Sequence, residues 1–347
     1  MSADLRPNIR AMAGYTPGEQ PRDNVTIKLN TNENPYPPSP RVFEALRQAI
    51  IADRLRRYPD PLGTAFRLAA GRVLGVDPDG ILIGNGSDDV LTIVTRAWVP
   101  EGGLVVSPSP SYLLYNTLAA IQGARFHTVP FTPDWDLPSP WPVHEAHLTF
   151  LASPNSPSGT SLAPSTLQRL IEEVDGPLVI DEAYVDFADA HALSLARQRN
   201  VIVVRSLSKS YALAGVRFGF AVADPALVRE LIKVKDSYNC DVLSLVAATA
   251  AIEDQDYLQS TRARIRATRQ RLTAALRALG FDVTPSQANF VWCRHAHRPV
   301  QPIYQELKKR MILVRYMPYE GYGDGLRITI GTDAEIDKLV EELQRLL

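Results

Sequence analysis

The sequence contains few cysteines, no excess of charge of either sign and no long apolar run. Only Cys240 and Cys293 occur, far apart, which excludes a disulfide framework and favours a reducing compartment. The 37 Lys and Arg residues nearly balance the 38 Asp and Glu residues, which argues against a protein that coats nucleic acid. No apolar stretch reaches the roughly 18 residues of a membrane span, and residues 1–12 lack the apolar core of a signal peptide. We therefore expect a cytoplasmic protein with no nucleic-acid and no membrane partner.

Apolar runs alternate with helical patterns between about residues 80 and 223, and several runs are apolar on both faces. Such strands are typical of a sheet covered by helices on both sides. The predicted strands are Ile81–Gly84, Leu104–Val106, Arg125–Val129, Leu148–Ala152, Leu178–Asp181, Val201–Arg205 and Phe218–Val222. The predicted helices between them are Asp88–Trp98, Tyr112–Gln122, Pro164–Glu173 and Leu193–Arg199. This alternation predicts an α/β fold with a mainly parallel, seven-stranded sheet between helices.

The pattern changes after about residue 255. The segment Gln259–Gly280 is rich in arginine, but four of its apolar residues fall on one helical face, so we interpret the arginines as a solvated face rather than a nucleic-acid site. Predicted strands follow at Phe290–Cys293, Leu313–Tyr316 and Leu326–Ile330. The last helix opens with Thr332 and Glu335 at the spacing of a capping box. We expect a smaller α+β domain here.

A lysine with candidate phosphate ligands follows one of the predicted buried strands. Lys209 stands among small residues, where a lysine is costly unless it is used. Ser206, Ser208 and Arg217 supply two hydroxyls and a planar guanidinium that could bind a phosphate. The P-loop pattern is absent, so Lys209 is either a Schiff-base lysine for pyridoxal phosphate (PLP) or a solvated loop lysine.

A second predicted strand ends in the carboxylate of Asp181. Ligands of open α/β sheets lie at the carboxyl ends of strands, and Asp181 and Lys209 follow consecutive predicted strands. PLP needs an acid beside its ring nitrogen, since a carboxylate stabilises the protonated ring that accepts electrons from the substrate. Tyr184 and Asn155 could donate hydrogen bonds to the 3′ oxygen of such a ring.

A glycine-containing turn, Gly84–Asp89, lies between a predicted strand and a predicted helix. The glycines allow close backbone approach, and the N–H groups at the helix N-terminus can bind a phosphate. The spacing differs from G-x-G-x-x-G, which argues against a dinucleotide site.

These motifs together resemble a known family. Ser206-x-Ser208-Lys209 with Arg217, Asp181-x-x-Tyr184 and Ser153–Gly159 resemble the fold-type I PLP-dependent aminotransferases, in the expected order over nearly the whole chain. Further motifs are similar to those of the histidinol-phosphate aminotransferases, namely Leu29–Pro35, Arg57–Pro61, Gly84–Asp88, Pro110–Tyr115 and Leu326–Gly331. The chain departs from the family pattern at Asp89, Ser153, Ser156 and Ser158, which leaves the substrate preference open.

The resemblance implies a role for each matching residue. Lys209 would bind PLP covalently and Asp181 would pair with the pyridine nitrogen, with Tyr184 as the third catalytic residue. Asn155 and Tyr184 would contact the 3′ oxygen, and Tyr112 would stack on the ring. The residues that would hold the cofactor phosphate are Gly86, Ser87, Asp88, Ser206, Ser208 and Arg217.

The resemblance also implies a homodimer and a substrate site. Tyr58 would reach the phosphate in the neighbouring subunit. Arg327 would hold the anionic end of the substrate with help from Arg315, and an N-terminal arm with Tyr15 and the loop Asn32–Asn34, including Asn34, would close over it. The implied domains are residues 1–34 (arm and part of the small domain), 35–255 (large PLP-binding domain) and 256–347 (small α+β domain).

The implied reaction is transfer of an amino group from L-histidinol phosphate to 2-oxoglutarate in histidine biosynthesis. An aromatic amino-acid aminotransferase and a phosphothreonine decarboxylase of the same fold remain alternatives, because a guanidinium such as that of Arg327 binds carboxylate and phosphate alike. The histidines near His144 and His295 are not interpreted as metal ligands, so we predict no metal.

Overall fold

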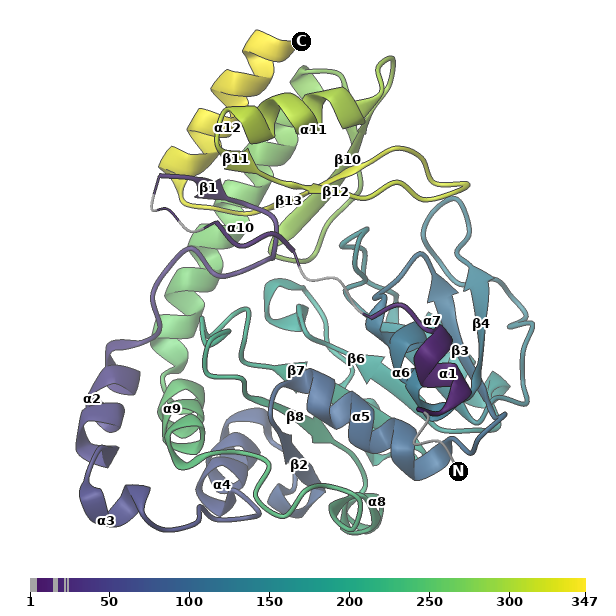
Figure 1. The fold of residues 1–347 in the computed structure, drawn as a ribbon, viewed down its shortest axis with the longest axis vertical. Coiled ribbons are helices and arrows are strands. Elements are labelled where there is room, and N and C mark those ends of the chain that lie inside the picture. Colours follow the sequence, from purple (N-terminus) through teal and green to yellow (C-terminus); the bar gives the residue numbers. More distant parts are fainter. Residues whose placement is uncertain (1–4, 15–17, 22, 24) are drawn as a thin grey trace.

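The structure is a computed structural model that describes residues 5–14, 18–21, 23 and 25–347. Tyr15, which the sequence assigns to substrate binding, lies outside the described residues. Two sheets with separate hydrophobic cores make up most of the molecule, and the long helix α10 (Gln255–Ala278) extends from one to the other (Figure 1). The domain limits taken from the sequence stay a prediction.

The larger sheet has the strand order β2-β8-β7-β6-β5-β3-β4. Only β8 runs antiparallel to its neighbours within this sheet, so the predicted mainly parallel, seven-stranded sheet is confirmed. Its strands are β2 (Ile81–Gly84), β3 (Leu104–Ser109), β4 (Arg125–Pro130), β5 (Leu148–Ala152), β6 (Leu178–Asp181), β7 (Val201–Ser206) and β8 (Gly219–Val222). Along β7, Val203 packs into the apolar core on one face of this sheet and Val204 into the core on its other face. Both faces are therefore buried, which explains why these strands are apolar on both faces.

Helices pack on both faces of this sheet (Figure 1). They include α5 (Ser87–Trp98), α6 (Leu114–Gln122), α7 (Pro164–Glu173) and α8 (Pro225–Ile232), with α4 (Thr64–Leu74) and α9 (Val242–Glu253) packed together. Other helical elements are α1 (Pro7–Ala11), α2 (Pro40–Ala49), α3 (Ala52–Leu55) and the 3₁₀ turns Pro78–Gly80 and Val185–Phe187. The predicted helix Leu193–Arg199 is wrong: a 3₁₀ turn spans Leu193–Arg197, because Asn200 takes a left-handed conformation (φ 67°) and the chain enters β7.

The smaller sheet has the order β12-β13-β10-β9 and is antiparallel. Its strands are β9 (Phe281–Val283), β10 (Phe290–His295), β12 (Arg315–Tyr316) and β13 (Leu326–Thr329), and α10, α11 (Val300–Lys309) and α12 (Asp333–Leu346) pack around its core. The predicted strand Leu313–Tyr316 is two strands, because β11 (Ile312–Leu313) pairs with β1 (Ile27–Lys28) whereas Arg315 pairs into the other sheet.

Two features of the C-terminal segment follow the sequence closely. The apolar residues Ile265, Leu272 and Leu276 of α10 are buried, and Arg266 and Arg271 form ion pairs with Asp side chains, as a solvated helix face requires. The capping box at the start of α12 is confirmed, with the Thr332 N–H donating to Glu335. No helix in the described part of the chain is long and apolar enough to cross a membrane.

Candidate active site

A cavity of about 240 Å³ lies where the parallel strands β6 and β7 end. Eleven residues that the sequence assigned to cofactor or substrate line it: Ser87, Asp88, Tyr112, Asp181, Tyr184, Ser206, Ser208, Lys209, Arg217, Arg315 and Arg327. The fold therefore brings the two sequence-distant parts of the predicted site, the strand ends and the strand-to-helix turn, around one space.

Asp181 ends β6 and is nearly fully buried at 5% exposure. Its Oδ1 accepts a hydrogen bond from the Ala183 N–H at 3.1 Å, and its Oδ2 accepts one from the Tyr115 hydroxyl at 2.8 Å. Burial raises the pKa of the Asp181 carboxyl to about 6, although these two hydrogen bonds act in the opposite direction. An ionised carboxylate in such a place suits a cationic partner.

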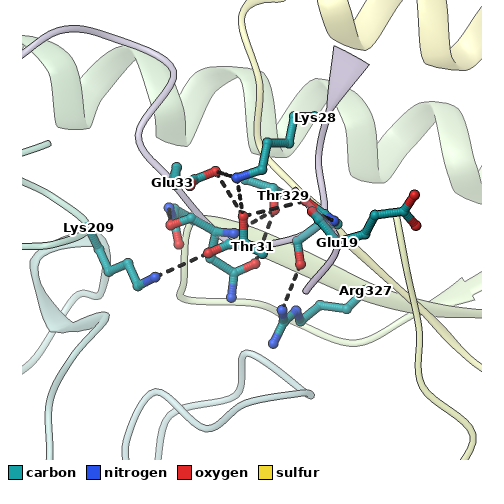
Figure 2. A network of polar contacts seen from close by, with 10 residues as sticks. Glu19, Lys28, Thr31, Glu33, Lys209, Arg327 and Thr329 are labelled. Atoms are coloured by element: carbon teal, nitrogen blue, oxygen red, sulfur yellow. Dashed lines mark hydrogen bonds and ion pairs between the residues drawn. The ribbon is translucent and has the colours of Figure 1, made fainter. Parts of the chain in front are cut away.

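The amine of Lys209 enters the same cavity. Its Nζ donates a hydrogen bond to the Thr31 carbonyl at 3.2 Å, as Figure 2 shows. Burial, with a smaller contribution from the Arg327 charge, lowers the pKa of Lys209 to about 8. An amine with a lowered pKa is more often neutral and can act as a nucleophile or a base.

One end of the cavity carries hydrogen-bond donors suited to a phosphate. Arg217 Nη1 donates to the Ser208 hydroxyl at 3.2 Å, and Nη2 lies 3.5 Å from the Asp88 carboxylate. The N-terminus of α5 opens beside them at Ser87. Gly86, which precedes it at φ +85°, leaves room for this arginine, because a Cβ there would lie 2.5 Å from Arg217 Nη2.

The Tyr184 hydroxyl is held by Asn32, a residue of the N-terminal loop that the resemblance assigns to closing over the substrate. Asn32 Nδ2 donates to the Tyr184 oxygen at 3.0 Å, while Asn32 itself is fixed by Thr329 and by the side chain of Asn289. Asn32 adopts φ 58°, a left-handed conformation that Asn tolerates better than most residues. With its oxygen accepting from Asn32, Tyr184 keeps its own proton to donate into the cavity.

The opposite end of the cavity carries two arginines. Arg315 on β12 and Arg327 on β13 are direct register partners, so both side chains leave the same face of the sheet. Arg327 donates to the Ser156 hydroxyl and to the Asn30 carbonyl, both at 3.0 Å. Paired guanidinium groups of this kind recognise an anionic group such as a carboxylate or a phosphate.

Four of the predicted site residues that the structure describes are not part of the cavity lining: Gly86, described above, and Asn34, Asn155 and Tyr58. Asn34 donates to the main-chain carbonyls of Lys209 and Ser210, and so ties the N-terminal segment to the lysine loop. The amide hydrogens of Asn155 are used by the Pro110 carbonyl and the Ser158 hydroxyl. Tyr58 is 80% exposed and stacks on Tyr238, with ring centroids 4.4 Å apart. The roles given to Asn34, Asn155 and Tyr58 stay predictions.

Several further residues reach the site without having been given a role from the sequence. They include Gly18, Gln20, Thr31, Ser111, Ser156 and Met317, which line the cavity, and Tyr115, which contacts Asp181 from behind. Three of them, Thr31, Ser111 and Tyr115, lie within the motifs Leu29–Pro35 and Pro110–Tyr115, so these motifs were the signal in the sequence that could have pointed to them.

Comparison with known proteins identifies the family. The family model for class I and II aminotransferases matches residues 24–343. The histidinol-phosphate aminotransferase of Rhodopirellula baltica is 50% identical over 344 residues, which cover 98% of this chain and 95% of that protein. Histidinol-phosphate aminotransferase 1 of Trichormus variabilis is 48% identical over 350 residues and matches over the full length of both. The chain belongs to the class I and II aminotransferase family.

A solved structure supports this membership. The histidinol-phosphate aminotransferase of Sinorhizobium meliloti, crystallised in complex with pyridoxal-5′-phosphate, superposes with a TM-score of 0.88 at 26% identity, covering 100% of this chain and 99% of the other. The predicted fold-type I architecture and the resemblance to histidinol-phosphate aminotransferases are thus confirmed. This aminotransferase is an enzyme.

Proposed function

We propose that this aminotransferase uses PLP to transfer the amino group of L-histidinol phosphate to 2-oxoglutarate, a step of histidine biosynthesis. The choice of histidinol phosphate as amino donor rests on Arg315 and Arg327. These two arginines are paired across neighbouring strands, and both line the cavity. A dianionic phosphomonoester can use both, whereas a single carboxylate needs only one. The names of the relatives point to the same substrate.

The residues around the cavity fit PLP. At one end the ligands Ser206, Ser208, Arg217 and the N-terminus of α5 suit a phosphate, and the close fit of Arg217 against Gly86 keeps that guanidinium at the α5 end. The buried carboxylate of Asp181 suits a protonated ring nitrogen, and Lys209 supplies the amine for covalent attachment. When bound, PLP withdraws electrons from the substrate carbon that bears the amino group, which makes the proton on that carbon acidic.

The chain's own residues then have separable tasks. Lys209 Nζ, with its lowered pKa, would act as the base that takes the proton from the substrate carbon and passes it to the 4′ carbon of the cofactor. The Tyr184 hydroxyl, oriented by Asn32, donates toward the cofactor's 3′ oxygen. Arg327 and Arg315 hold the anionic end of the substrate, so that the reacting carbon faces Lys209.

The proposed active unit is a homodimer in which Tyr58 completes the neighbouring site. Tyr58 lies outside its own chain's cavity and in a region of exposed apolar side chains. These side chains are Phe43, Ile50, Ile51, Leu55, Leu62, Leu68 and Tyr238. Such exposure is typical of a surface that a second chain covers. The cytoplasmic location expected from the sequence stays a prediction.

Steady-state kinetics on three donors tests this function. With 2-oxoglutarate as acceptor, we expect kcat/KM for histidinol phosphate to exceed that for phenylalanine by about a hundredfold or more. Phenylalanine lacks the phosphate, so it would leave part of the hydrogen-bonding capacity of Arg315 and Arg327 unused. Replacement of Arg327 by Ala should remove most of this preference. Higher kcat/KM for phenylalanine would reject the proposal in favour of an aromatic aminotransferase, and release of carbon dioxide from phosphothreonine would favour the decarboxylase.

A further inference from the structure

A buried tyrosine lies directly behind Asp181 and outside the cavity. Tyr115 on α6 has no exposed surface, and its hydroxyl donates to Asp181 Oδ2 at 2.8 Å. Its ring stacks on Phe150 of β5, with centroids 4.6 Å apart and planes 8° apart, and it meets the Tyr112 ring edge-on at 5.6 Å. The hydroxyl is therefore held in place by packing on both sides.

We propose that Tyr115 is a positioning residue, whose hydroxyl keeps Asp181 ionised and fixes the direction of its carboxylate toward the cofactor's ring nitrogen. The proposal rests on PLP binding as proposed above. It follows from the geometry of both carboxylate oxygens, because Oδ1 is held by the Ala183 N–H and Oδ2 by Tyr115. Because the two hydrogen-bond donors belong to different parts of the chain, they fix the carboxylate of Asp181 in one orientation. Its remaining lone pairs are then available to a ligand in the cavity.

The surroundings of Asp181 show why a donor is needed there. Burial raises the pKa of this carboxyl most, and the negative charges of Asp88 on α5 and of Glu182 raise it further. The Glu182 charge is partly compensated by Arg205 of β7, at 2.8 Å. Against these effects stand the two hydrogen bonds, from the Tyr115 hydroxyl and the Ala183 N–H, both of which lower this pKa.

Tyr115 is suited to remain a donor at all working pH values. Burial and the neighbouring Asp181 charge raise the pKa of the Tyr115 phenol well above its ordinary value, so it keeps its proton. The other ionisable phenol facing Asp181, Tyr184, also has a pKa raised by burial. Among the described residues, the charges of Asp88 and Glu182 act on Asp181, the Tyr115 hydroxyl donates to it, and the Tyr184 phenol and the Lys209 amine line the same cavity.

The substitution Tyr115→Phe separates the hydroxyl from the ring, because phenylalanine preserves the stacking on Phe150. A matched control is Tyr257→Phe, at the start of α10. The Tyr257 hydroxyl also donates at 2.8 Å, but to the Pro37 carbonyl rather than to Asp181. The Asp181→Asn variant, alone and combined with Tyr115→Phe, completes a double-mutant cycle. The measured quantity is the dissociation constant of PLP, obtained by absorbance titration of each cofactor-free variant over a range of pH.

We expect Tyr115→Phe to weaken PLP binding by about tenfold, in the range for losing a hydrogen bond to a charged group. Its binding should also begin to weaken at a higher pH than in the unmodified chain, because loss of the donor raises the pKa of Asp181 and a protonated carboxyl cannot pair with a cationic ring. Tyr257→Phe should bind as the unmodified chain does. In the Asp181→Asn background, Tyr115→Phe should change the dissociation constant less than about twofold, since no charge remains to be stabilised.

Equal binding by Tyr115→Phe and the unmodified chain would overturn the proposal. So would a tenfold loss that persists in the Asp181→Asn background, because that would indicate a general packing effect. Thermal unfolding of the cofactor-free variants detects a variant that fails to fold. If Tyr115→Phe does not fold, the cycle with Asp181→Asn is repeated with Tyr115→Leu, which also lacks the donor and should show the same loss of affinity, again only where Asp181 is present. Failure of the unmodified chain to bind PLP would instead reject the proposed function.

Discussion

At Lys209, burial and the Arg327 guanidinium lower the pKa of the amine, whereas the Glu33 carboxylate raises it. Glu33 also forms an ion pair with Lys28 and accepts a hydrogen bond from the Thr31 hydroxyl (Figure 2). The N-terminal segment beside Lys209 therefore contains both a negative and a positive side chain that pair with each other. The polar segment Asn30–Asn34 thus influences the basicity of the catalytic amine as well as covering it. Such a contact between residues far apart in the chain has no periodic signature in the sequence.

The pKa of Lys209 gives a pH prediction. The rate of PLP uptake by the cofactor-free chain should rise with pH through about 8 and level off above it, because only the neutral amine reacts. Glu33→Gln removes a charge that stabilises the ammonium form, so the midpoint should move to lower pH. Stopped-flow absorbance measures it, and Glu306→Gln, on the surface of α11, is the control. A midpoint near the value of about 10.4 for an exposed lysine would contradict this account.

At the scale of elements, the sequence predicted the sheet well because buried parallel strands are short, apolar on both faces and separated by helices. It predicted the site for the same reason, since Asp181 and Lys209 stand where consecutive strands end. The sequence did not predict features that depend on contacts between residues far apart in the chain. The run Leu313–Tyr316 is divided between two sheets, and the role of Tyr115 depends on a contact with a residue 66 positions away.

The N-terminus of α5 supplies a prediction for an element. Gly86→Ala should weaken PLP binding by about tenfold or more, because the added Cβ would displace Arg217 from its place beside Ser208. Gly102→Ala is a matched control: it has a similar positive φ of +74°, but no atom lies within 4 Å of its added Cβ. Both variants should lose stability from backbone strain, Gly86→Ala by about 1–3 kcal/mol because its φ of 85° and ψ of 165° suit glycine alone, and only Gly86→Ala should lose affinity. Equal affinities in the two variants would contradict this role of Gly86.

At the scale of the whole molecule, the helices α2, α3 and α4 lie together at one corner (Figure 1). This region carries Tyr58 and much of the exposed apolar surface. The sequence pattern did not predict these helices. Their exposed apolar residues fit the proposed homodimer, in which a second chain would cover them.

Mixing variants tests whether Tyr58 acts across subunits. Tyr58→Ala and Lys209→Ala should each be nearly inactive, but dimers re-formed from an equal mixture should regain about a quarter of the unmodified activity, because half are mixed and each mixed dimer has one complete site. A mixture of Lys209→Ala with Asp181→Asn should regain none, since both residues belong to the same chain's cavity. Absence of recovery in the first mixture, with dimers formed, would place Tyr58 outside the partner's site.

Borohydride reduction of the PLP-loaded chain, followed by digestion and mass spectrometry, tests the central claim most directly. The account predicts that the cofactor is found on the peptide that contains Lys209 and on no other, and that Lys209→Ala yields no labelled peptide. Cofactor attached to another lysine, such as the buried Lys235, or an unlabelled chain that still transaminates, would contradict it.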